Sequence, residues 1–267
     1  MNLFLKIGTY FVVALIVLYG CNSKSNRTPI KYSFFVAGHT YGNPMQKNIG
    51  LYPPFKELTE SINKNPKYEL GVFTGDVVRT PDIEHWTEAI NDINNFNVPI
   101  HIARGNHDGG AIFDSLFHKS FYAFKKHNDL FIILAPAGWN IKNQQLEFLD
   151  STLKNNQGKV KNTFVFAHEL IWWSPEKYPD VKVNYLPHYP GHTNYWEDVH
   201  PLFKNYGQTI YLFSGDVGCT DLVTSYAYKE KDNVKFLASG MGGGDKDNFI
   251  KVDVLTNDSV LTEFIEF

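Results

Sequence analysis

The sequence predicts a single α/β domain built as a four-layer sandwich, in which two mixed sheets pack face to face with helices outside. Five short apolar runs, rich in β-branched and aromatic residues, are continuous rather than alternating. Such runs are typical of strands buried on both faces. Helical patterns lie mainly early in the chain and paired strand patterns late. This order suits two sheets layered between helices.

The first part of the chain alternates strand and helix patterns. Each apolar run ends at a glycine or a polar residue, which marks the end of a strand. Between the runs, apolar residues recur at helical spacing, as at Phe55, Leu58 and Ile62. We expect strands over 34–37, 70–74 and 98–103, and helices over 53–63 and 83–96.

The second part contains more strand patterns. Two apolar runs separated by the polar stretch 125–129 predict a hairpin over 121–134, and a helical pattern covers 144–153. Two continuous runs then precede His168 and Asp216. We expect strands over 163–167, 210–214, 225–228, 234–238, 249–254 and 260–264.

Side chains that can bind a metal follow the five apolar runs. Active sites of open α/β folds are built by separate loops at strand ends, so these side chains are candidates for one shared site. Any one of them taken alone is also compatible with an ordinary turn. The candidates are His39, Asp76, Asn106, His168 and Asp216.

The most informative string is Arg104-Gly105-Asn106-His107-Asp108, directly after an apolar run. An amide oxygen, an imidazole and a carboxylate where a strand meets the surface can together hold a metal and move a proton. The alternative is an Asx-type turn with a solvated histidine. The similar strings around the other strand ends favour the functional interpretation.

The pairs Gly75-Asp76 and Gly105-Asn106, the following His107-Asp108, and the later His168 resemble the calcineurin-like metallophosphoesterases. The resemblance covers about residues 31–267. That family carries five ordered motifs, and the middle three match well here. The resemblance implies the four-layer α/β fold and metal-dependent hydrolysis of phosphoester bonds.

The two outer motifs depart from the family pattern. The first, normally Asp-x-His, reads Ala37-Gly38-His39, and the last, normally Gly-His-x-His, reads Gly215-Asp216-Val217-Gly218. The resemblance therefore implies one intact ion site and one that has lost half of its protein ligands. The intact site, called the main-ion site below, comprises Asp76, Asn106, His168 and Asp216. The site that has lost half of its ligands, called the His39 site below, retains His39 and the shared Asp76.

Two carboxylates, an amide oxygen and an imidazole suit Mn²⁺, Mg²⁺, Fe²⁺ or Ca²⁺ more than a thiophilic ion, with Zn²⁺ also open. We expect about one tightly bound divalent ion. Without a cation, nearby carboxylates would repel one another. The alternative is a metal-free relic in which backbone amides bind Asp76 and Asp216.

The resemblance also implies roles for three residues beside the ion. His107 corresponds to the general acid that protonates the leaving oxygen, with Asp108 orienting it. Arg104 corresponds to a residue that grips phosphate, a task that suits a planar guanidinium. The expected partner is a phosphorylated substrate of unknown type. Because two ligand positions are lost, the alternative is a catalytically impaired binding or scaffold protein that kept the fold.

Length and charge set outer bounds. The chain has 267 residues, enough for one substantial core. Its 25 Lys and Arg against 28 Asp and Glu give a net charge of −3, and no basic cluster stands out. A phosphate-tracking surface for nucleic acid is therefore not expected.

The N-terminus resembles a bacterial lipoprotein leader. Lys6 precedes an apolar run over 11–18, and Leu18-Tyr19-Gly20-Cys21 resembles the site at which the cysteine becomes lipidated. We expect a signal peptide over 1–20, a polar tether over 21–30, and an exported protein anchored in the cell envelope through lipidated Cys21. A plain membrane anchor is the alternative, although the apolar stretch is short of the ~20 residues of a spanning helix.

An aromatic-rich segment over 170–196 separates the last two ligand motifs. Its rings could form the wall of a substrate pocket, or they could pin the segment to the body of the protein. Cys219 follows Asp216 closely and is expected to be a small core residue rather than a ligand.

Overall fold

The computed structural model describes residues 28–267 except 185, 187 and 188. The expected signal peptide, Cys21 and tether residues up to 27 lie outside the described residues. Within the described part, no helix combines the length and apolar character needed to cross a membrane.

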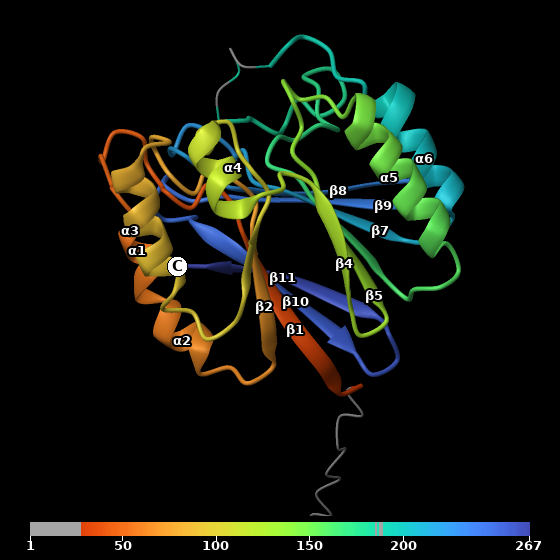
Figure 1. Ribbon diagram of the computed structural model, residues 1–267, viewed down its shortest axis with the longest axis horizontal. Helices are drawn as coiled ribbons and strands as arrows, with labels where there is room; N and C mark the ends of the chain where they lie inside the picture. Colours follow the sequence, from red (N-terminus) through yellow and green to blue (C-terminus); the bar gives the residue numbers. More distant parts are fainter. Residues whose placement is uncertain (1–27, 185, 187–188) are drawn as a thin grey trace, which may run out of the picture.

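Two mixed sheets form the body of the protein (Figure 1). The five-stranded sheet has the order β11-β10-β1-β2-β3, and the six-stranded sheet has the order β4-β5-β6-β7-β9-β8. The first comprises β1 (Ile30–Ala37), β2 (Tyr68–Phe73), β3 (Ile100–Ile102), β10 (Asn248–Leu255) and β11 (Val260–Glu266). The second comprises β4 (Tyr122–Lys126), β5 (Asp129–Ile133), β6 (Thr163–Phe166), β7 (Ile210–Ser214), β8 (Tyr226–Lys231) and β9 (Val234–Ser239).

Alternating side chains of the strands supply separate apolar layers. Along β1, Phe34 and Val36 enter the layer between the two sheets, whereas Phe35 enters the layer beneath the helices of the five-stranded sheet. All three side chains are fully buried. This double burial explains why the strand sequence is continuously apolar. A third apolar layer covers the outer face of the six-stranded sheet.

Helices cover both outer faces (Figure 1). On the five-stranded sheet lie α1 (Pro53–Glu57), α2 (Thr59–Asn63) and α3 (Ile83–Ile93), and on the six-stranded sheet lie α5 (Asn143–Asn156) and α6 (His200–Tyr206). A short α4 (Ala111–Phe117) follows β3, and a π-helical turn, η2 (Tyr195–Val199), runs into α6. The predicted four-layer α/β sandwich is confirmed.

Some elements differ in detail from those expected. The helix expected over 53–63 is split, because the N–H of Leu58 donates to Phe55 three residues back and tightens the turn. The hairpin turn is shorter than expected, since Lys126 still pairs with Asp129. Neither α4 nor α6 was expected from the sequence.

Most of the described aromatic side chains of the segment 170–196 pack on the outer face of the six-stranded sheet. Trp172 and Tyr195 are fully buried, and the ring of Trp172 stacks on Phe236 of β9 with centroids 4.9 Å apart. Trp173 is buried as well. Of the two alternatives for this segment, the described rings therefore favour the one in which they pin it to the body of the protein. Apolar burial favours this packing over exposure around a polar site.

Candidate metal centre

The predicted ligands meet where the carboxyl ends of strands from both sheets converge. β1, β2 and β3 run parallel, as do β5, β6 and β7. The two sheets approach closely here, since a Cβ on Gly38 would lie 2.5 Å from the Cα of Gly215. Only glycine permits such a backbone approach. The glycines that follow β1 and β7 therefore bring the loops of the two sheets together.

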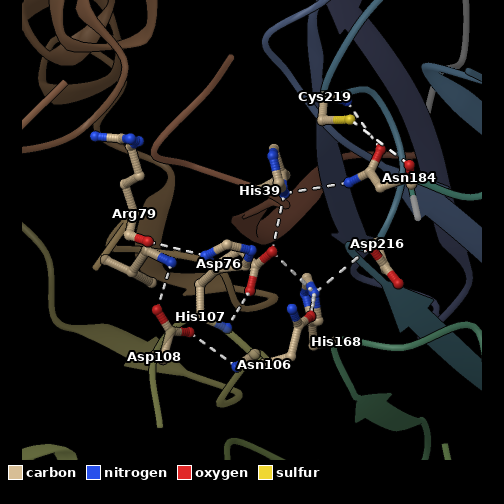
Figure 2. Close-up of polar contacts among 12 residues, drawn as sticks. His39, Asp76, Arg79, Asn106, His107, Asp108, His168, Asn184, Asp216 and Cys219 are labelled. Carbon is tan, nitrogen blue, oxygen red and sulfur yellow. Dashed lines mark hydrogen bonds and ion pairs between the residues drawn. The ribbon is translucent and has the colours of Figure 1, made fainter. Parts of the chain in front are cut away.

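Three acidic or imidazole side chains form the centre of the site. Asp76, His168 and Asp216 are buried and offer ligand atoms that all lie within 4.8 Å of one another. The Nε2 atom of His168 lies 3.3 Å from Asp76 Oδ2 and 3.8 Å from Asp216 Oδ1. The Oδ1 atom of Asn106 lies 3.1 Å from the same nitrogen (Figure 2). The structure thus brings together all four residues of the predicted main-ion site.

The hydrogen bonding of His168 shows why a cation fits. Its Nδ1 lies 2.8 Å from the carbonyl oxygen of Thr74, which can only accept, so Nδ1 must carry a proton. The opposite nitrogen, Nε2, faces oxygen atoms of Asp76, Asn106 and Asp216. A neutral imidazole would direct a lone pair at these oxygens. A divalent ion among them, or a second proton on the ring, resolves the conflict.

The local electrostatics also favour positive charge. Burial opposes ionisation of Asp76, yet His168 and His39 outweigh it and hold the pKa of Asp76 well below its usual value. Burial likewise opposes protonation of His168, but Asp76 and Asp216 raise its pKa well above the ordinary value. The neighbouring Glu169 is a further buried carboxyl, and burial raises its pKa to about 7. An oxygen-rich, acidic and buried donor set of this kind suits a hard divalent ion.

His39 and Asp76 adopt strained backbone conformations. Both have φ near +53°, in the left-handed region that non-glycine residues rarely occupy. Such conformations cost on the order of 1–3 kcal/mol each and cluster at functional sites. In these conformations the two side chains point toward each other, and His39 Nδ1 lies 3.1 Å from Asp76 Oδ2.

A cavity of about 310 Å³ opens over the cluster. Tyr41 forms part of its wall, with its ring centroid 4.4 Å from that of His39 and 5.2 Å from that of His107. The lining residues are His39, Tyr41, Pro44, Asp76, Asn106, His107, Asn184, Asp216 and Cys219. The cavity is large enough for a small phosphoester group.

His107 lies at the cavity, but its predicted partner does not orient it. The Nδ1 atom of His107 donates to the carbonyl oxygen of Arg79 at 2.9 Å. Asp108 is fully buried and accepts instead from the backbone N–H groups of Val77, Val78 and Gly105 at 2.7, 3.1 and 2.8 Å. The expectation that Asp108 orients His107 is therefore wrong. Asp108 supports the two loops that carry Asp76 and Asn106.

Arg104 does not reach the cavity. Its guanidinium lies 3.8 Å from Asp114 Oδ1 and over the ring of Phe113, both on α4. The unexpected α4 gives this side chain a carboxylate and an aromatic face to contact. The structure does not place Arg104 where it could grip a phosphate beside the main-ion site.

Two residues near the ligands were not singled out by the sequence as site residues. Asn184, from the aromatic segment, places its Nδ2 atom 3.2 Å from His39 Nδ1, and its Oδ1 accepts from the N–H of Cys219 at 2.9 Å. Cys219 lines the cavity, and burial followed by the charge of Asp216 raises the pKa of its thiol to about 11. No motif marks Asn184, because its position depends on how a long loop folds back.

Comparisons with known proteins identify one family. The sequence profile of the calcineurin-like phosphoesterase family matches residues 38–219, about two thirds of the chain. No curated protein matches the sequence.

Solved structures with similarity to this chain include three distant proteins. Vps29 from Chaetomium thermophilum is 10% identical with a TM-score of 0.38, and 89% of this chain and 96% of that chain are covered. A predicted phosphoesterase from Streptococcus pneumoniae is 12% identical with a TM-score of 0.33, covering 88% and 98%. A protein from Thermotoga maritima is 12% identical with a TM-score of 0.41, covering 88% and 99%. On the family match, and with its motif residues gathered in one site, this chain belongs to the calcineurin-like phosphoesterase family.

Proposed function

We propose that the protein is a metal-dependent hydrolase of phosphoester bonds that holds one divalent ion in the main-ion site. The ligands would be Asp76, Asn106, His168 and Asp216. The observation that carries the proposal is the Nε2 atom of His168, which faces an oxygen atom from each of the other three residues. The donor set favours Mn²⁺, Fe²⁺ or Mg²⁺, with Zn²⁺ also compatible.

When bound, the ion would polarise a phosphoryl oxygen and lower the pKa of an attacking water. His107 would supply the proton for the leaving oxygen. Its Nδ1 is engaged by the Arg79 carbonyl, so the imidazolium donates from Nε2 into the cavity that His107 lines. The N–H of His107 donates to Asp76 Oδ1 at 3.0 Å, which holds the acid beside the ligand shell.

Metal analysis together with turnover tests the proposal. Purified protein should contain about one divalent ion, and should hydrolyse p-nitrophenyl phosphate or bis(p-nitrophenyl) phosphate when Mn²⁺ is added. His168→Ala should lose both the ion and the activity. His192→Ala is the matched control, because that histidine is exposed and pairs with Glu197 on the surface.

A binding or scaffold role is the competing function. It is favoured by the loss of ligands at Ala37 and Gly218 and by the position of Arg104 away from the cavity. Protein that retains its ion, binds inorganic phosphate and hydrolyses neither ester would support this role over the enzyme.

We further propose that the protein is exported and anchored in a bacterial cell envelope through lipidated Cys21. The basis is the leader pattern ending in Leu18-Tyr19-Gly20-Cys21. Full-length protein expressed in bacteria should fractionate with membranes and incorporate labelled palmitate. Cys21→Ser should abolish labelling, and labelling that persists would contradict the proposal.

A further inference from the structure

The His39 site lacks the protein ligands that a second ion needs. Ala37 is fully buried and offers no donor atom in its side chain. A side chain at Gly218 is also excluded, because φ is +80° and a Cβ would lie 2.5 Å from the carbonyl carbon of Gly240. An imidazole therefore does not fit at this position. His39 and Asp76 remain, and two protein ligands do not make a tight site.

The place beside Nδ1 of His39, the ring nitrogen that faces Asp76, is taken by the side chain of Asn184 (Figure 2). The N–H of Cys219 can only donate, so the atom of Asn184 that lies 2.9 Å from it must be the carbonyl oxygen. This fixes the amide nitrogen toward His39 Nδ1, 3.2 Å away. The main-chain N–H of Asn184 also donates to the carbonyl oxygen of Asp216 at 3.1 Å. Asn184 is thus tied to the loop that carries a main-ion ligand.

An amide NH₂ acts on charge in the opposite way from a carboxylate. It can only donate hydrogen bonds, and its partial positive charge disfavours a nearby cation but favours an anionic oxygen. Asn184 lines the cavity together with His107 and Asp216. A phosphoryl oxygen in that cavity would meet the amide at the side where the His39 site lies.

We propose that Asn184 takes the place of the second ion: it excludes a cation from the His39 site and donates to a phosphoryl oxygen of the substrate. The part that concerns substrate rests on the proposed hydrolase function. The exclusion of the second ion does not depend on that function. It rests on the contacts of Asn184, the steric restriction at Gly218 and the missing donor atom at Ala37.

A single ion also restricts the charge of the substrate. Among the described residues that line the cavity there is no lysine or arginine. The carboxylates of Asp76 and Asp216 are balanced by one divalent ion, so the imidazolium proposed for His107 supplies a single positive charge, which matches a monoanion better than a dianion. A phosphomonoester carries nearly two negative charges at neutral pH, whereas a diester carries one. The cavity should therefore favour phosphodiesters.

Metal stoichiometry tests the exclusion independently of turnover. Wild type loaded with Mn²⁺ and desalted should contain about one ion by mass spectrometry. Asn184→Asp replaces the NH₂ with an oxygen facing His39 and should contain about two. The control Asn205→Asp adds the same charge at an exposed position on α6 and should remain at one.

Two results would overturn the exclusion: wild type that holds two ions tightly, or folded Asn184→Asp that holds only one. If circular dichroism shows that Asn184→Asp is unfolded, calorimetric titration of wild type with Mn²⁺ decides. A second equivalent that binds as tightly as the first contradicts the inference, and a single tight equivalent supports it.

The substrate part is tested with two aryl esters. Wild type should hydrolyse bis(p-nitrophenyl) phosphate faster than p-nitrophenyl phosphate, and Asn184→Asp should move the ratio toward the monoester. Asn184→Ala should keep one ion and lose on the order of 10²-fold in diester turnover, as for removal of a catalytic donor. A wild-type preference for the monoester overturns the substrate assignment. Inactivity on both esters refutes the proposed function, while the ion count still decides the role of Asn184.

Discussion

His107 and Asp76 are adjacent in the site but have separable roles. Asp76 offers Oδ2 to the main-ion site, whereas His107 contacts Asp76 through its backbone N–H and directs its ring to the cavity. Because His107 contacts Asp76 through its backbone, its imidazole can be removed by mutation without removing an ion ligand.

His107→Ala should lower turnover by about 10²–10⁴-fold, the usual contribution of general acid catalysis, and should leave the ion bound. Asp76→Ala should lose the ion itself, because that carboxylate faces both His168 and His39. Rate assays and metal analysis on the same preparations check both outcomes. Loss of metal in His107→Ala would show that the imidazole is a ligand.

Asp108 is a structural carboxylate, and its substitution should show this. Asp108→Asn places an NH₂ group against backbone N–H donors and should destabilise the protein by about 1–3 kcal/mol in urea unfolding. Asp114→Asn is the control, since its contact with Arg104 is exposed and long at 3.8 Å. Equal stability of the two variants would show that the three hydrogen bonds to Asp108 contribute little.

The ligands could be predicted from sequence because each follows the end of an apolar strand within two to four residues, as Asp76 follows β2 and Asp216 follows β7. Asn184 could not, because it lies 145 positions from His39 and belongs to no strand. The roles predicted for Asp108 and Arg104 differ from the contacts that the structure shows for them. Both depend on which partners the folded loops present, and residue type alone does not specify that.

At the scale of elements, strands were predicted more reliably than short helices. Continuous burial leaves a clear apolar signature in β1 or β7, whereas α4 begins after Gly110 with φ near +103° and no side-chain cap. α6 begins with His200-Pro201 directly after η2, which contains the last rings of the aromatic segment, and these rings obscure the helical pattern. Elements of this length are stabilised mainly by packing, which the local sequence does not show.

His101 joins the edge strands of the two sheets. Its ring stacks on Phe124 of β4 with centroids 4.2 Å apart, and Nδ1 lies 2.9 Å from the hydroxyl of Tyr122. Burial, followed by the charge of Lys126, lowers the pKa of His101 in the folded protein. As the pH falls, His101 is therefore protonated in the unfolded chain at a higher pH than in the folded protein, and this favours unfolding.

The contribution of His101 to stability should be complete above about pH 6.5 and should be lost as the pH falls toward the lowered folded-state pKa. Urea unfolding at pH 7.5 and 5.5, compared with His101→Gln, isolates this residue from other titrating groups. The wild type should lose more stability than the variant over that interval. A variant with the same pH dependence would contradict the assignment.

At the scale of the whole molecule, removal of the ion should lower thermal stability. An ion at about 100 times its Kd stabilises the folded state by about 2.7 kcal/mol. For a domain of this size that corresponds to roughly 5–10 °C in Tm. Calorimetry before and after treatment with EDTA, followed by Mn²⁺ addition, measures the effect. A Tm that neither falls with EDTA nor recovers with Mn²⁺ would refute a tightly bound ion.

The close approach of Gly38 and Gly215 has a consequence for when the protein acquires its ion. Asp76 and Asn106 follow strands of one sheet, whereas His168 and Asp216 follow strands of the other. Neither sheet by itself carries the complete donor set, so a tight ion is captured only after the two sheets have docked. Metal uptake would thus be a late event in maturation. The ion content of a preparation would then report the fraction of molecules whose two halves have assembled correctly.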